Sequence, residues 1–75
     1  MDIKDFIADF ADQFDDTDAS EITPDTNFHE LDEWSSLTAM GVIAFVRTNY
    51  GKKITGNEIR DCKTVKDLFD LINNK

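Results

Sequence analysis

The sequence predicts an all-α domain made of four helices. Apolar residues recur at the spacing of an amphipathic helix in four segments, and polar capping residues stand at several of their starts. No segment shows a convincing alternation of apolar and polar residues of the kind that marks a half-buried strand. A chain of 75 residues can bury one small hydrophobic core, so we expect a single domain over residues 1–75.

The first helix is predicted over residues 2–14. Its apolar residues recur every three or four positions: Ile3, Phe6, Ile7, Phe10 and Phe14. Asp2 is a preferred N-cap residue in front of them.

Residues 15–35 are predicted to be a long connection, because they are rich in turn formers and include Pro24. A loop of about 20 residues is unusual in a small domain, and a function at its far end would explain it. We expect Ile22, Phe28 and Leu31 to hold it against the core.

The second helix is predicted over residues 36–50. Its apolar residues cover more than one face, which is typical of a central helix with several neighbours. Gly41 lowers the helix propensity, so we expect it to mark the close approach of another element or of a partner. Gly51 is a natural C-terminal stop.

Two further helices are predicted, a short one over residues 55–61 and a last one over residues 64–73. Thr55 with Glu58, and Thr64 with Asp67, have the spacing of a capping box. The side chains expected to be largely buried are Phe6, Phe10, Leu37, Ile43, Val46, Leu68 and Phe69.

The charge is strongly negative and unevenly placed. The chain has 16 acidic and 8 basic residues, a formal charge of −8. Residues 1–36 hold 12 acidic and 1 basic residue, whereas residues 37–75 hold 4 acidic and 7 basic residues. This acidity argues against nucleic acid as a partner and favours proteins with basic patches. The single cysteine, Cys62, allows no internal disulfide and fits a reducing compartment, and no segment is long and apolar enough to span a membrane. We expect a cytoplasmic protein that is a monomer.

The junction at Ser35 and Ser36 is the candidate functional site. A hydroxyl at a helix start lies beside unpaired backbone N–H groups and the positive end of the helix dipole, which is a favourable place for a phosphate. From the junction alone, an N-cap serine without chemistry is the commoner explanation. Trp34 beside it could be core, loop anchor or partner contact.

This stretch resembles the prosthetic-group site of the acyl carrier protein family. That family carries a serine, usually within Asp-Ser-Leu, at the start of its second helix. Counted from Phe28, the family serine falls on Ser36, followed by Leu37. Ser35 stands where the family has Asp, and residues 31–34 read Leu-Asp-Glu-Trp where the family often has Leu-Gly and a small residue.

The resemblance implies a four-helix acyl-carrier bundle with a long first loop and a short third helix. It also implies that a phosphopantetheinyl transferase moves 4′-phosphopantetheine from coenzyme A onto Ser36. Of the two serines, the more consistent arrangement has Ser35 as the helix cap and Ser36 as the first helical residue, pointing outward. The thiol would then carry an acyl or aminoacyl thioester, so the protein would be a carrier and not an enzyme. The cargo stays open among fatty acyl, aminoacyl and specialised acyl units.

The implied partners are the transferase, an acyl- or aminoacyl-loading ligase, and downstream acyltransferases or synthases. Candidate partner contacts are Asp32, Glu33, Trp34, Ser35, Leu37, Met40 and Gly41. Residues 37–50 contain no acid, unlike many family members, which predicts a dedicated enzyme set. The alternative is a small acidic protein-interaction module that is never modified. Neither His29 nor Cys62 has neighbours that suggest a metal site.

Overall fold

Four α-helices and two 3-10 helices make up the computed structural model, which describes residues 2–75. The α-helices are α1 (Ile3–Ala11), α2 (Ser36–Tyr50), α3 (Gly56–Asp61) and α4 (Val65–Asn73). The 3-10 helices η1 (Ala19–Glu21) and η2 (Phe28–Glu30) lie between α1 and α2. Residues 2–75 contain no strand beyond an isolated bridge between Asn27 and Thr64. The predicted all-α fold is confirmed.

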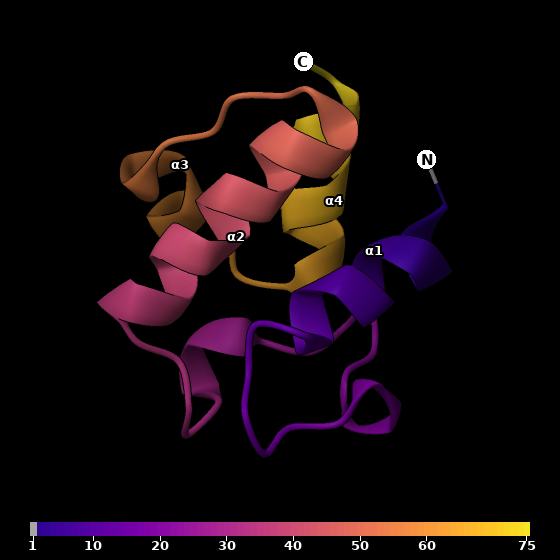
Figure 1. Cartoon of the computed structure of the whole chain (residues 1–75), viewed down its shortest axis with the longest axis vertical. Helices are drawn as coiled ribbons and strands as arrows, with labels where there is room; N and C mark the ends of the chain where they lie inside the picture. Colours follow the sequence, from indigo (N-terminus) through magenta and orange to yellow (C-terminus); the bar gives the residue numbers. More distant parts are fainter. Residues whose placement is uncertain (1) are drawn as a thin grey trace.

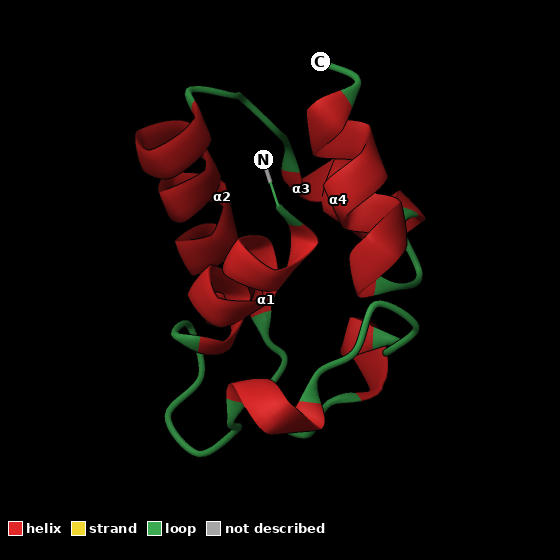
Figure 2. Cartoon of the chain, turned by 90° about the vertical axis from the view of Figure 1, so that its right-hand side faces the viewer, coloured by secondary structure: helices red, strands yellow, loops and turns green. Residues whose placement is uncertain are grey.

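The long connection from α1 to α2 covers one end of the helices. Figure 1 shows it beneath α1, α2 and α4, and the side view of Figure 2 shows it in the same place. It is tied to α4, because the amides of Val65 and Lys66 donate to the carbonyls of Thr26 (3.1 Å) and Pro24 (2.9 Å). These two bonds fix the middle of the connection against the start of α4, ahead of the segment that leads into α2.

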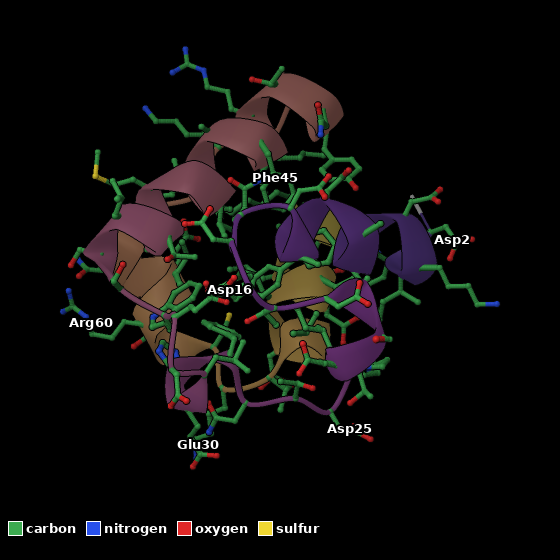
Figure 3. The ribbon with its side chains drawn as sticks, turned by 60° about the horizontal axis from the view of Figure 1, so that its bottom comes forward. Asp2, Asp16, Asp25, Glu30, Phe45 and Arg60 are labelled. Atoms are coloured by element: carbon green, nitrogen blue, oxygen red, sulfur yellow. The ribbon has the colours of Figure 1, made fainter. Side chains whose placement is uncertain are left out.

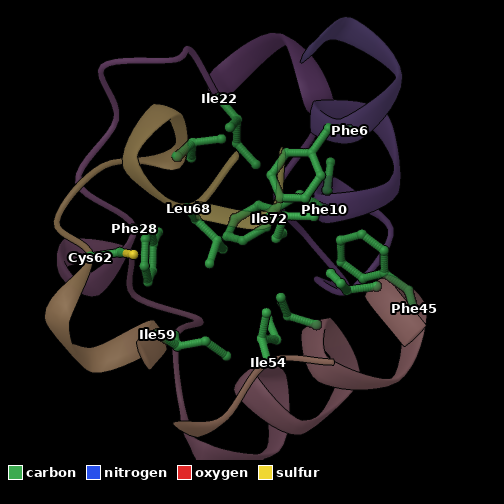
Figure 4. Close-up of a cluster of buried hydrophobic side chains, with 14 of the residues drawn as sticks. Phe6, Phe10, Ile22, Phe28, Phe45, Ile54, Ile59, Cys62, Leu68 and Ile72 are labelled. Atoms are coloured by element: carbon green, nitrogen blue, oxygen red, sulfur yellow. The ribbon is translucent and has the colours of Figure 1, made fainter. Parts of the chain in front are cut away.

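Side chains from every α-helix and from the connection meet in one aromatic-rich core (Figure 4). Phe6, Phe10, Val46 and Leu68 are fully buried, as predicted, while Ile43 and Phe69 are half-buried against the core. The prediction for Leu37 is wrong, because 77% of its surface is exposed.

The exposure of Leu37 follows from the face of α2 that meets the core. The buried residues of α2 are Thr38, Val42, Phe45 and Val46, which have the spacing of one helical face. Leu37 precedes this face by one residue, about 100° around the helix axis. The apolar run of α2 therefore has one face inside and one in solvent.

The first helix is shorter than predicted and ends at Ala11. The amides of Gln13 and Phe14 donate to the carbonyls three residues before them, at 3.1 and 3.0 Å, so the chain tightens after the helix. Phe14 stays buried all the same. The periodic pattern predicted its burial, but the helix stops one turn earlier.

The helix caps are as predicted. Asp2 accepts the amide of Lys4 at the start of α1. Capping boxes stand at the starts of α3 and α4, with Thr55 and Thr64 as the N-caps. Gly51 ends α2 in the left-handed conformation, at φ 66°. In the connection Ile22 and Phe28 are buried and Leu31 is half-buried.

Candidate functional site

Ser35 is the N-cap of α2. Its backbone is extended, and its Oγ accepts the amide of Thr38 at 3.4 Å. The Thr38 hydroxyl lies 3.3 Å from the same Oγ and donates to the Glu33 carbonyl at 3.0 Å. The side chain of Ser35 therefore turns back towards the first turn of the helix.

Ser36 is the first residue of α2, and its side chain is exposed. Within residues 2–75, the amides of Ser36 and Leu37 have no hydrogen-bond acceptor, as expected for a helix start. These free N–H groups and the helix dipole place partial positive charge beside the Ser36 hydroxyl. The first turn of α2 thus fits an anionic group attached at Ser36.

A groove of about 390 Å³ opens beside Ser36, between α2 and α3. Apolar side chains of Trp34, Ile43 and Ile59 form part of its lining, together with His29 and Arg60. Figure 3 shows the Arg60 side chain extending from α3 on the side of the molecule where α2 begins. The ion pairs within residues 2–75 are Lys66–Asp70 and Lys75–Glu58, so Arg60 has no carboxylate partner there.

Trp34 joins this groove to the core. Its ring is nearly parallel to that of Phe10, with centroids 6.1 Å apart, and meets Phe28 edge-on at 4.7 Å. The side chain is half-buried and also borders the groove. Trp34 is therefore an anchor of the loop, and its exposed part is available beside Ser36.

The other candidate contacts surround the start of α2. Asp32 is exposed, and Leu37 and Met40 are exposed by 77% and 64%. Gly41 faces the side chain of Gln13, in the turn after α1, because a Cβ atom built on it would lie 2.5 Å from Oε1 of Gln13. The close approach that the glycine predicted is therefore made by one flexible side chain of the turn and not by the backbone of another helix.

Glu33 is engaged within the chain. Its carboxylate accepts the amides of Asp15 and Asp16 and the hydroxyl of Thr17. The bond from Thr17, followed by the amide of Asp16, lowers the pKa of the Glu33 carboxyl below its ordinary value. The sequence carries no local signal for these contacts, since the partners lie 16 to 18 residues away.

His29 and Cys62 have structural positions. Nε2 of His29 lies 2.8 Å from the Cys62 carbonyl oxygen, which links η2 to the end of α3. Cys62 is buried, and burial raises the pKa of its thiol. In residues 2–75, no group of three or more His, Cys, Asp or Glu side chains could hold a metal ion.

Comparison with known proteins identifies the class to which this fold and site belong. Residues 3–72 match the family model described as "Phosphopantetheine attachment site". An acyl carrier protein of Thermosynechococcus vestitus is 34% identical over 58 residues, which are 77% of this chain and 72% of that protein. An acyl carrier protein of Thermobifida fusca is 27% identical over 70 residues, 93% of this chain and 89% of that protein. No solved structure matches the chain significantly.

The chain therefore belongs to the acyl carrier protein family. It is a carrier and not a catalyst, and its prosthetic group is 4′-phosphopantetheine. Family membership also implies a phosphopantetheinyl transferase and loading enzymes as partners. None of the helices in residues 2–75 has the length and apolar character needed to cross a membrane.

Proposed function

We propose that Ser36 is the attachment residue and that residues 1–75 act as one carrier domain, monomeric in solution. The observation that supports this is the different use of the two serines. Both residues are exposed, but the Ser35 hydroxyl caps α2, whereas the Ser36 hydroxyl makes no hydrogen bond within residues 2–75 and lies at the helix start beside two free amides. In the transfer, Ser36 Oγ forms a bond to the phosphorus of the phosphopantetheine group and the serine proton passes to the transferase. The pyrophosphate bond of coenzyme A breaks, and adenosine 3′,5′-bisphosphate leaves with the electron pair of that bond.

The residues of this chain have simple tasks in the proposed function. The first turn of α2 stabilises the phosphodiester through its free amides and dipole. The groove between α2 and α3 lies where the arm leaves Ser36. The arm supplies a terminal thiol that holds the cargo as a thioester.

Intact mass after incubation with a phosphopantetheinyl transferase and coenzyme A tests the attachment site. Wild type should gain one phosphopantetheinyl group, and Ser36→Ala should gain none. Ser35→Ala would remove the helix cap and cost about 1 kcal/mol, so Ser35→Asp is the better control because Asp also caps helices. Modification of Ser36→Ala, or its loss in Ser35→Asp with Ser36 intact, would contradict the assignment.

We further propose that the carrier serves a dedicated acyl or aminoacyl pathway, with a loading ligase and downstream acyltransferases or synthases. The support is the surface of α2, which has no acidic residue, carries Arg47 and exposes Leu37 and Met40. Asp32, in the turn before α2, is exposed. This surface suits a partner with an apolar socket bordered on one side by basic residues.

The test compares this carrier, loaded with an acyl group, with a carrier whose second helix is acidic. A ketoacyl synthase of general fatty-acid synthesis should turn this one over poorly at physiological salt, since charge complementarity governs association. Comparable turnover would refute the proposal. On the carrier's own loading ligase, Asp32→Lys and Met40→Ala should each reduce kcat/KM.

A further inference from the structure

Glu33 joins two parts of the molecule that flank the attachment serine. One oxygen of its carboxylate accepts the amides of Asp15 (3.1 Å) and Asp16 (3.0 Å). The other accepts the amide of Asp16 at 3.2 Å and the hydroxyl of Thr17. The Glu33 side chain thus holds the turn that follows α1. Asp16, in the middle of this turn, is labelled in Figure 3.

The Glu33 carboxylate makes these hydrogen bonds in a negatively charged part of the chain. The turn carries Asp15, Asp16 and Asp18, and like charges repel a further carboxylate. Glu33 nevertheless turns into this turn, where backbone N–H groups face its oxygens. Hydrogen bonds to an ionised carboxylate are strong ones, and here they outweigh the repulsion.

The main chain of Glu33 is bonded in the other direction. Its carbonyl accepts the hydroxyl of Thr38, a buried residue in the first turn of α2. The Thr38 amide in turn donates to Ser35. Ser36 lies in the segment from Glu33 to Thr38 that these two bonds close. One residue therefore connects the turn after α1 with the helix start that carries the attachment site.

We propose that Glu33 is a positioning residue for the modification of Ser36, acting by holding the 15–17 turn and the first turn of α2 as one unit. The inference rests on Ser36 as the attachment residue. A transferase must align the Ser36 hydroxyl with a phosphorus atom, and a small misplacement of a reacting atom can slow a reaction as much as about 100-fold. The hydrogen bonds of Glu33 to residues 15–17 and to Thr38 fix the backbone that leads to the Ser36 hydroxyl.

Three variants separate positioning from simpler roles. Glu33→Gln keeps the side-chain shape but loses the charge and one acceptor oxygen. Thr17→Val removes a donor to Glu33 and leaves every acidic residue in place. Glu30→Gln is the matched control, since it makes the same substitution at an exposed residue of the same loop. All are measured where circular dichroism and Trp34 fluorescence show them folded.

Modification rate and amide hydrogen exchange are the readouts. Glu33→Gln should lower kcat/KM for phosphopantetheine transfer by about 10-fold, mainly through kcat, and Thr17→Val should lower it by less. In both, exchange should quicken at Asp16 and also at Thr38 and Ala39, on the α2 side. Glu30→Gln should change neither readout.

Two results would overturn the proposal. If Glu33→Gln slows transfer while Thr17→Val does not, Glu33 contacts the transferase directly. If Asp16 exchanges faster but Thr38 does not, and transfer is unchanged, the contact is merely structural. A failure of Ser36 as the attachment residue would appear instead as an unmodified wild type or as modification of Ser36→Ala. The exchange at Thr38 would still decide whether Glu33 holds the helix start.

Discussion

Replacing Leu68 or Leu37 with alanine removes the same atoms from two different environments. Leu68 is fully buried in α4, and 77% of Leu37 is exposed at the start of α2. Truncating a buried leucine costs about 2–5 kcal/mol, because the transfer free energy is lost and a cavity remains. Burying a leucine fully stabilises by about 1.5–3 kcal/mol, so the quarter of Leu37 that is covered accounts for about 0.5 kcal/mol.

The size of the domain makes this difference easy to measure. At roughly 0.05–0.15 kcal/mol per residue, 75 residues unfold with about 4–11 kcal/mol. Leu68→Ala should therefore remove a large share of the stability. Urea unfolding, followed by far-ultraviolet circular dichroism and by the fluorescence of Trp34, the single tryptophan, gives the free energy of unfolding of each variant.

Equal losses in the two variants would refute this reasoning, as would a loss under about 1 kcal/mol for Leu68→Ala. The two optical signals also check each other, since Trp34 reports the loop and the helical signal reports the bundle. If Leu37→Ala cost more than about 1 kcal/mol, that side chain would be packed within the domain and could not be part of a partner surface.

Three further predictions concern titration and packing. Hydrogen bonds to Thr17, Lys75 and the Thr64 backbone lower the pKa values of Glu33, Glu58 and Asp67, respectively. The contribution of these carboxylates to the free energy of unfolding is therefore fully present above their ordinary pKa values of 4.5, 4.5 and 3.8. The free energy of unfolding should fall as the pH drops through the lowered values, and urea midpoints measured against pH will show whether it does. Burial and a hydrogen bond to Asp9 raise the pKa of Tyr50 to about 12. Absorbance titration of this single tyrosine should have its midpoint near pH 12, and a midpoint near 10 would contradict the contact. The contribution of Tyr50 to the free energy of unfolding should be fully present below pH 10 and lost as the pH rises towards 12. Gly41→Ala should stabilise by up to about 1 kcal/mol in urea melts if the flexible Gln13 side chain moves aside, and destabilisation would mean that it cannot.

Most of the helical plan can be read from local patterns. The capping boxes at Thr55 and Thr64, the stop at Gly51 and the burial of Phe6 and Phe10 depend on residues within a few positions of one another. The bounds of α2 and the cap at Ser35 follow in the same way. These features need only the chain's own period and its local hydrogen bonds.

Tertiary contacts decided the rest. The end of α1 at Ala11, the exposure of Leu37 and the bonds of Glu33 depend on which faces meet and on partners far away in the sequence. An apolar run shows that α2 is central, but it does not show which face of that helix meets the core. Likewise, acidic residues before Ser36 show where charge gathers, and only the fold turns one of them, Glu33, towards backbone N–H groups 17 and 18 residues earlier.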